Sequence, residues 1–125
     1  ISGSAEQYYN GGIIESLRYW GITGTDATAY LQNPNVAYST ATGDWKQKIG
    51  TQKWLALYNR GFDAWTEIRR LDYPVLPAPA DPVTDFPVRY TYPVQEQNLN
   101  TAKWTEAAAA IGGDDVTTKL FWDKF

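Results

Sequence analysis

The chain has 125 residues, with 11 basic and 14 acidic side chains, a formal net charge of −3, and neither Cys nor His. A balance of this kind provides no basic stripe for phosphate groups, which argues against nucleic-acid binding. The missing His removes the usual general base at neutral pH and every Ser-His-Asp or Cys-His arrangement within the chain, and the missing Cys removes disulfides and thiolate metal sites.

Aromatic side chains are the unusual part of the composition, with 6 Trp and 9 Tyr. Such side chains bury large areas and also form binding platforms, so composition leaves both uses open. The sequence has no stretch long and apolar enough to cross a bilayer and no pattern that indicates a cofactor. Because the chain opens on Ile1, without an initiator Met or a signal peptide, we expect it to be a segment cut from a longer protein.

The first predicted element is a helix over residues 5–20. Apolar residues recur there at helical spacing and form one face, made by Tyr9, Ile13, Ile14, Leu17 and Trp20. Ser4 and Gln7 have the spacing of a capping box, and Gly21 stands where a C-terminal cap glycine is expected. Gly11 and Gly12 lie inside this run and cost about 1 kcal/mol each relative to Ala. Packing must compensate for them, or a neighbour must approach closely.

Residues 22–44 are predicted to be mostly irregular. A short helix over 26–31 is expected, ended by Asn33 and Pro34. Residues 38–43 are polar and typical of a loop.

Residues 46–71 predict two antiparallel helices with a turn at 59–61. Trp54 and Tyr58 share a face by their spacing, and the second helix presents Phe62, Trp65, Ile68 and Leu71. This layout loosely resembles one tetratricopeptide-type repeat, a unit that needs neighbours to bury both of its faces.

The following segment is dense in proline, which blocks helix and limits strand pairing. We expect an extended, ordered wrap over residues 74–93 with one short strand at 88–92. A linker is the alternative, but several large side chains need burial and favour packing along the helices: Tyr73, Leu76, Phe86, Tyr90 and Tyr92.

The last part of the chain predicts a helix over residues 101–111, capped by Asn100 and stopped by Gly112 and Gly113. The apolar tail at 120–122 is expected to dock on the body. The fold class predicted for the whole chain is mainly α, with TPR-like helical hairpins, long proline-rich ordered loops and at most a short β-strand or hairpin.

Four stretches carry a family resemblance because they occur together in one order. They are 8–13 (an aromatic-Gly-Ile helix start), 52–74 (Gln-Lys-Trp, then paired arginines and Tyr-Pro), 86–100, and 112–123 (Gly-Gly-Asp to Trp-Asp). In this respect the chain resembles the SusD/RagB family over most of its length, residues 22–44 excepted. The sequence departs from the family pattern at two positions. Val88 stands where a second arginine is common, and Phe121 replaces the first Trp of the closing pair. Both residues keep the apolar or extended character of these positions, so the expected fold is unchanged.

The resemblance implies a fold and a function. Family members are several times longer, carry a lipidated Cys near the start, and have several TPR units before this region. Residues 1–125 are therefore expected to be a single C-terminal segment of a SusD-like domain, without its N-terminal TPR-containing part. The implied protein is a surface-exposed outer-membrane lipoprotein that lids a SusC-like TonB-dependent transporter and captures glycans or other nutrients.

Candidate ligand-binding residues are Tyr38 and Trp45, in or beside the irregular segment, where the helical pattern does not require them. Sugar rings stack on exposed aromatics, and loops often carry binding residues. The alternative is that both anchor the loop. Trp54, Tyr58 and Trp65 are expected to be core, and Arg69 and Arg70 to pair with carboxylates or cap a helix C-terminus.

Two acidic pairs have a functional and a structural interpretation. Asp63 and Glu67 suit glycoside hydrolysis only across a cleft, and a solvated ion-pair face is favoured. Asp114 and Asp115 follow two glycines, and a capped turn explains them better than calcium, which needs more oxygen ligands.

The sequence therefore predicts a non-catalytic nutrient-binding module. A structural scaffold that contacts the transporter without touching a ligand is the alternative, and a hydrolase is a distant third. No metal site is expected.

Overall fold

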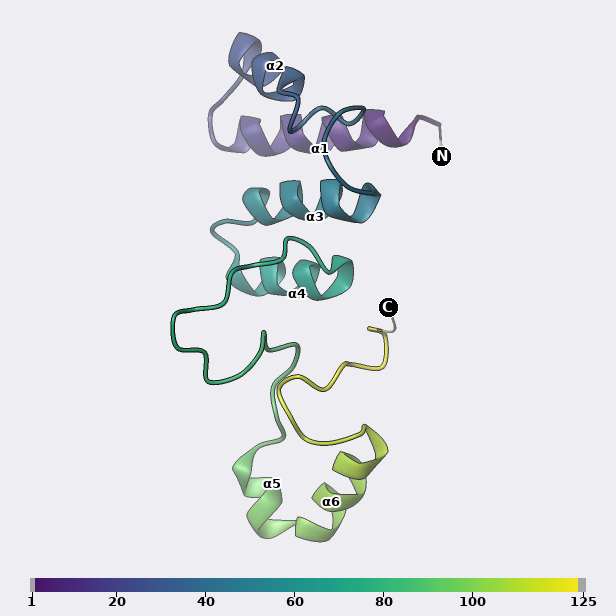
Figure 1. Ribbon diagram of the computed structural model, residues 1–125, viewed down its shortest axis with the longest axis vertical. Helices are drawn as coiled ribbons and strands as arrows, with labels where there is room; N and C mark the ends of the chain where they lie inside the picture. The colour runs from purple at the N-terminus through teal and green to yellow at the C-terminus, as the bar shows by residue number, and fades with distance from the viewer. Residues whose placement is uncertain (1, 124–125) are drawn as a thin grey trace. The chain divides into compact units, whose positions relative to one another are not determined.

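The computed structural model describes residues 2–123, and these residues form six helices and no strand (Figure 1). This confirms the mainly-α prediction. The chain divides into two compact units, Ile1–Val75 and Leu76–Phe125, which are described in turn. None of the helices within residues 2–123 has the length and apolarity needed to span a bilayer.

Helix α1 (Ala5–Tyr19) begins and ends as its sequence predicts. The Ser4 amide donates to Gln7 Oε1 at 2.8 Å, and the Gln7 amide donates to Ser4 Oγ at 3.2 Å, which completes the capping box. Trp20 is the C-cap, and Gly21 follows with a φ of 79°, a left-handed conformation that glycine adopts without strain.

Helix α2 (Gly24–Gln32) starts two residues earlier than expected and ends at Gln32, with Asn33 as its C-cap before Pro34. The segment that follows turns back on itself: the amides of Val36 and Ala37 both donate to the Asn33 carbonyl, at 2.8 and 2.9 Å. These turns order the predicted loop without adding another helix.

Helices α3 (Trp45–Ala56) and α4 (Gly61–Leu71) form the predicted hairpin. Asp44 caps α3 by accepting a hydrogen bond from the Gln47 amide at 3.0 Å. Within this unit, Figure 1 shows α1, α3 and α4 as successive neighbours, with α2 against α1.

Two aromatic residues of the hairpin are not core, contrary to prediction. Tyr58 is 83% exposed because α3 ends at Ala56 and leaves it in the connecting turn. Phe62 is 72% exposed in the first turn of α4. The buried stripe of α4 is made instead by Ala64, Ile68 and Leu71. Trp54 and Trp65 are half-buried, so the prediction holds for them only in part.

The core of the N-terminal unit joins α1 to the irregular segment. Tyr9, Ile13 and Val36 are buried together, and Leu17, Tyr30, Leu31, Tyr38 and Ile49 pack around them. The Tyr9 hydroxyl donates to the Val36 carbonyl at 2.7 Å. Burial, together with the neighbouring Tyr30, raises the pKa of Tyr9.

Two predictions for residues 76–100 are wrong. Residues 88–92 form no strand, because the Val88 and Arg89 amides both donate to the single carbonyl of Val116, at 2.8 and 3.2 Å, and no ladder follows. Asn100 does not cap the next helix with its side chain, which donates to Glu96 Oε2 at 3.1 Å instead.

The second unit contains a helical pair, α5 (Val94–Leu99) and α6 (Thr101–Ala110), of which only α6 was expected. Gly112 and Gly113 follow α6 with φ values of 85° and 127°, as predicted for a helix stop. Neither helix has a fully buried residue, so the unit offers little apolar core. Accordingly Tyr90 is 70% and Phe121 85% exposed, against the expectation of burial and docking.

Candidate functional site

Tyr38 is partly buried and packs as part of the core. Its ring lies 5.3 Å from the ring of Tyr9, between centroids, with a tilt of 57°. Lys48 Nζ lies 5.1 Å from the Tyr38 ring centroid and donates to the Tyr38 carbonyl at 2.7 Å. Tyr38 therefore ties the irregular segment to α1 and α3, and little of its ring remains for stacking.

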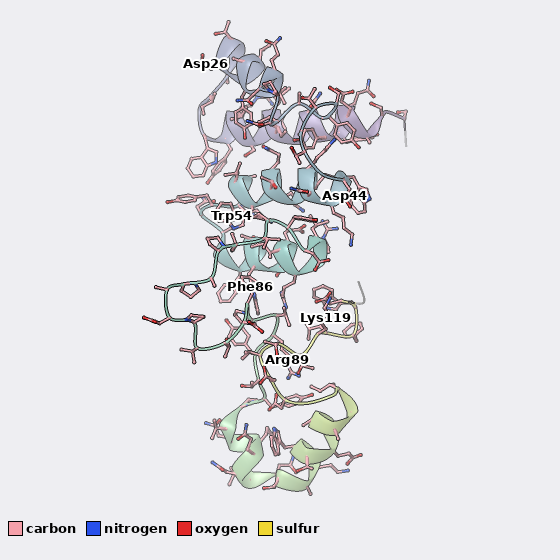
Figure 2. The ribbon with its side chains drawn as sticks, viewed as in Figure 1. Asp26, Asp44, Trp54, Phe86, Arg89 and Lys119 are labelled. Atoms are coloured by element: carbon pink, nitrogen blue, oxygen red, sulfur yellow. The ribbon has the colours of Figure 1, made fainter. Side chains whose placement is uncertain are left out.

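Trp45 has different surroundings. It is the first residue of α3, directly after the capping Asp44 (Figure 2), rather than a loop residue as its position in the sequence indicated. Its side chain is 53% exposed and is not among the ring contacts of Tyr38. The structure thus does not combine the two candidate residues into one site, and it leaves the Trp45 ring accessible at a rigid helix start.

A further accessible pair of aromatic side chains, which the sequence analysis did not propose as a site, lies at the end of α1. The rings of Tyr19 and Trp20 meet edge to face, 5.2 Å apart at an angle of 87°. The Asn59 side-chain amide donates to the Tyr19 hydroxyl at 3.1 Å, which links this end of α1 to the α3–α4 turn. The adjacent Tyr19 and Trp20 before Gly21 are the signal in the sequence, but helical spacing assigns Trp20 to the apolar face and leaves Tyr19 without a role.

An apolar groove of about 590 Å³ runs between α1 and α3. Its lining comes from α1, α2 and α3. It includes Leu17 and Trp20 of the predicted apolar face of α1, Tyr8 and Gly12 outside that face, Tyr30 of α2, and Ile49 and Leu55 of α3. The sequence predicted this face of α1 but not that part of it lies open.

Several of the polar groups beside the groove already bond within the chain. The Tyr30 hydroxyl donates to Gln52 Oε1 at 2.9 Å, and the Tyr8 hydroxyl donates to the Ser2 carbonyl at 2.8 Å. Lys53 Nζ lies 2.9 Å from Glu67 Oε1. The groove therefore presents apolar surface and few free hydrogen-bonding groups.

Glu67 is the centre of an ion-pair network, as predicted. Arg70 Nη2 lies 2.6 Å from Glu67 Oε2, and Lys53 binds the other oxygen. Burial pushes the pKa of Glu67 upward, but the hydrogen bonds and charges of Arg70 and Lys53 outweigh it and hold the pKa below its usual value. Asp63 faces a different cation, Arg60, at 3.9 Å. The two carboxylates are thus arranged as ion pairs on a helix.

The paired arginines take two roles. Arg70 pairs with a carboxylate, as expected. The Arg69 guanidinium lies over the Trp65 ring, 3.8 Å from its centroid, and donates to the Thr66 hydroxyl at 3.2 Å. Both roles are structural within the hairpin.

In the second unit, Asp114 is a buried hub. Its Oδ1 accepts hydrogen bonds from Arg89 Nη2 at 3.2 Å and from the Tyr92 amide at 2.9 Å, and its Oδ2 accepts one from Trp104 Nε1 at 2.8 Å. The side chains of Arg89 (Figure 2) and Asp114 are 8% and 3% exposed. Burial alone would raise the pKa of Asp114, but the hydrogen bonds from Trp104 and Tyr92 and the charge of Arg89 lower it.

The neighbouring Asp115 closes a turn. Its Oδ1 accepts hydrogen bonds from the Thr117 amide at 2.9 Å and from the Thr117 hydroxyl at 2.8 Å. The predicted capped turn is therefore confirmed for Asp115 but not for Asp114, which binds Arg89 instead. Within residues 2–123, no group of three or more acidic side chains is placed to hold a metal ion.

Comparison with known families gives the class of protein. The model of a SusD-like family, described as starch-binding and associating with the outer membrane, matches residues 1–93. The chain therefore belongs to the SusD-like family. The resemblance carried by the motifs is thereby confirmed.

Solved structures agree with this assignment. A SusD-like protein of Bacteroidetes AC2a is 28% identical, with a TM-score of 0.84, and the match covers 100% of this chain and 27% of the other. A chitin-binding protein is 30% identical, with a TM-score of 0.76, and the match covers 99% and 29%. A SusD homologue from Bacteroides fragilis is 29% identical, with a TM-score of 0.72, and the match covers 98% and 31%.

The chain thus spans less than a third of the length of these relatives. No curated protein matches it.

Proposed function

We propose that this chain is part of a non-catalytic glycan-binding protein that works at the bacterial outer membrane. The observation that carries the proposal is the family match over residues 1–93, in a family described as starch-binding. The chitin-binding relative at 30% identity supports the same ligand class. The protein would capture an oligosaccharide and pass it to a SusC-like TonB-dependent transporter, as a surface-exposed lipoprotein.

We also propose that residues 1–125 form the C-terminal segment of that protein. The chain is covered almost completely by relatives more than three times its length. The remaining length would hold the TPR-containing part, and with it most of the glycan-binding surface.

Within this segment, Trp45 is our proposed sugar contact and Tyr38 its support. Apolar faces of sugar rings stack on accessible aromatic rings, and the Trp45 ring is half exposed on a capped helix start. Tyr38 would hold in place the loop that leads to Trp45, through its contacts with Tyr9 and Lys48.

The experiment is calorimetry of the intact protein with chitin and starch oligosaccharides. Trp45→Ala is expected to weaken binding roughly five- to tenfold, the value of one aromatic stacking contact. Tyr58→Ala is the matched control, because Tyr58 is more exposed and lies beyond the other end of α3.

The alternative is a scaffold that contacts the transporter and no ligand. The paired polar groups beside the groove favour it, because they leave little for a sugar to bind there. Transporter binding by the intact protein with no oligosaccharide binding would establish the scaffold, and turnover of a glycan would refute both proposals.

A further inference from the structure

We propose that Tyr19, Trp20 and Asn59 form a second sugar-binding subsite, beyond the end of α3 that lies opposite to Trp45. This inference rests on the proposed glycan binding and deepens it, because it assigns a second contact to the same class of ligand. A pyranose ring would stack on the aromatic pair and exchange hydrogen bonds with Asn59 and the Tyr19 hydroxyl.

The aromatic pair is exposed and held in a fixed arrangement. The rings of Tyr19 and Trp20 lie 5.2 Å apart between centroids at an angle of 87°, and the two residues are 67% and 47% exposed. In an edge-to-face pair each ring keeps at least one face clear of its partner. Rings that already hold each other lose little conformational freedom when a ligand binds, so more of the contact energy appears as affinity. The pair thus suits the apolar C–H face of a sugar ring.

Asn59 supplies the polar groups that a glycan requires. Its side-chain amide donates to the Tyr19 hydroxyl at 3.1 Å, so this hydroxyl accepts one bond and can still donate its own proton. The amide can also accept through Oδ1 and donate through its second N–H. Polar groups beside an aromatic ring fix the orientation of a ligand that carries hydroxyls around its rim. The groove lining includes Trp20 but neither Tyr19 nor Asn59, so the subsite is not part of the groove.

The subsite is well separated from Trp45. Trp45 is the first residue of α3, whereas Asn59 lies beyond Ala56, the last residue of α3, in the turn before α4. Helix α3 has 12 residues, so its ends are roughly 17 Å apart at the usual rise per residue. One sugar ring therefore contacts one of the two places, and changes at the two places should act independently.

Calorimetry of the intact protein with chitin and starch oligosaccharides tests the subsite. Tyr19→Ala removes a ring and its hydroxyl and is expected to weaken binding about tenfold. Asn59→Ala keeps both rings and removes the amide, and it should weaken binding about threefold. When Tyr19→Ala is combined with Trp45→Ala, the two losses of affinity should multiply.

Two further variants control for indirect effects. Tyr58 precedes Asn59 in the same turn and is 83% exposed, but its ring is not one of the pair. Tyr58→Ala should therefore leave the affinity unchanged, and a loss equal to that of Tyr19→Ala would overturn the proposal. Tyr19→Phe keeps the ring pair and removes only the hydroxyl. It should lose no more affinity than Asn59→Ala, which keeps the test decisive if Tyr19→Ala fails to fold.

Fluorine NMR of the intact protein labelled with fluorotryptophan tests access to the pair directly. Trp20→Phe assigns the Trp20 signal, which should broaden with a soluble gadolinium chelate and shift when an oligosaccharide binds. A Trp20 signal that is protected from the chelate and unmoved by a bound oligosaccharide would overturn the subsite.

The variants also separate this subsite from the proposed function. Binding that Trp45→Ala weakens, but that Tyr19→Ala and Asn59→Ala leave unchanged, would refute the subsite alone. An intact protein that binds no oligosaccharide would refute the proposed function and the subsite together.

Discussion

The two units of the chain are stabilised in different ways. The α1–α4 unit gathers Tyr9, Ile13 and Val36 into an apolar core. The unit containing α5 and α6 has no fully buried residue on either helix and centres on the ion pair of Arg89 and Asp114. An apolar core tolerates partial loss, whereas a buried ion pair leaves an uncompensated charge when one partner is removed. The units should therefore respond differently to single changes.

The largest effect is expected from Asp114→Ala. The change leaves Arg89 buried without its carboxylate and removes the acceptors for Trp104 and Tyr92. The α5–α6 unit should lose its cooperative structure while the α1–α4 unit keeps its own. Loss of dispersion in the amide NMR spectrum should be confined to residues 76–123. Asp115→Ala is the control and should retain the dispersed spectrum. A dispersed spectrum in Asp114→Ala as well would show that the α5–α6 unit does not depend on the bonds of Asp114.

The next largest effect is expected in the α1–α4 unit from Leu71→Ala. Leu71 is 1% exposed, and truncation of such a residue costs about 2–5 kcal/mol. Urea unfolding monitored by circular dichroism measures the loss. Leu99→Ala is the matched control, because Leu99 is 86% exposed and its truncation should change stability by less than about 0.5 kcal/mol.

The pH dependence should also separate the two units. The pKa of Asp114 is lowered in the folded state. Its ionised carboxylate therefore contributes to the free energy of unfolding above the unfolded-state pKa near 3.8, and this contribution is lost as pH falls through the lower folded-state pKa. The pKa of Tyr9 is raised in the folded state. The neutral side chain therefore contributes to the free energy of unfolding below pH 10, and this contribution is lost as pH rises through the higher folded-state pKa.

NMR titration checks these opposite directions. The indole Nε1–H signal of Trp104 should move only in acid below the ordinary Asp value of 3.8, because the folded-state pKa of Asp114 is lowered. The Tyr9 ring signals should change only at alkaline pH, above the ordinary tyrosine value of 10, because the folded-state pKa of Tyr9 is raised. Loss of the α5–α6 fold in acid at a pH where the Trp104 signal has not yet begun to move would show that Asp114 is not the acid-sensitive group.

The smallest effect is expected from Tyr9→Phe. The ring stays in the core, but the hydrogen bond to the Val36 carbonyl is lost, which costs about 1 kcal/mol. Thermal unfolding measures the difference. Tyr19→Phe removes a hydroxyl that is bound only at the surface by Asn59, and it should change stability less.

Local signals in the sequence predicted much of the fold. The Ser4–Gln7 capping box and the left-handed Gly21 set the bounds of α1 by interactions between near neighbours. Asp44 and Gln47 have the same spacing as Ser4 and Gln7, and Asp44 caps α3. The start of that helix could therefore have been predicted from the sequence, but it was not. Helix α5 was not predicted because it has only six residues and follows a run of prolines.

Tertiary features were harder to predict. The bond between Arg89 and Asp114 joins residues 25 apart, and no periodicity indicates it. The exposure of Tyr58 and Phe62 depends on where α3 ends and where α4 begins, which aromatic spacing alone does not define. For the candidate site, the sequence offered Trp45 as a candidate residue but did not indicate its place at the start of a helix. It predicted the apolar face of α1 but not the groove, because a helical stripe does not show what covers it.

The contact between Gly50 and Tyr73 has a consequence for engineering. The chain leaving α4 returns over α3 and rests where Gly50 has no side chain. Asp72 makes this reversal possible by adopting a left-handed φ of 60°. Tyr73 thereby covers one side of the α3–α4 hairpin. A consensus repeat grafted after α4 would have to displace Tyr73. To add a helical repeat after the α3–α4 hairpin, a designer would need to end the native chain before Asp72. The residues around Gly50, which Tyr73 now covers, would also have to be redesigned.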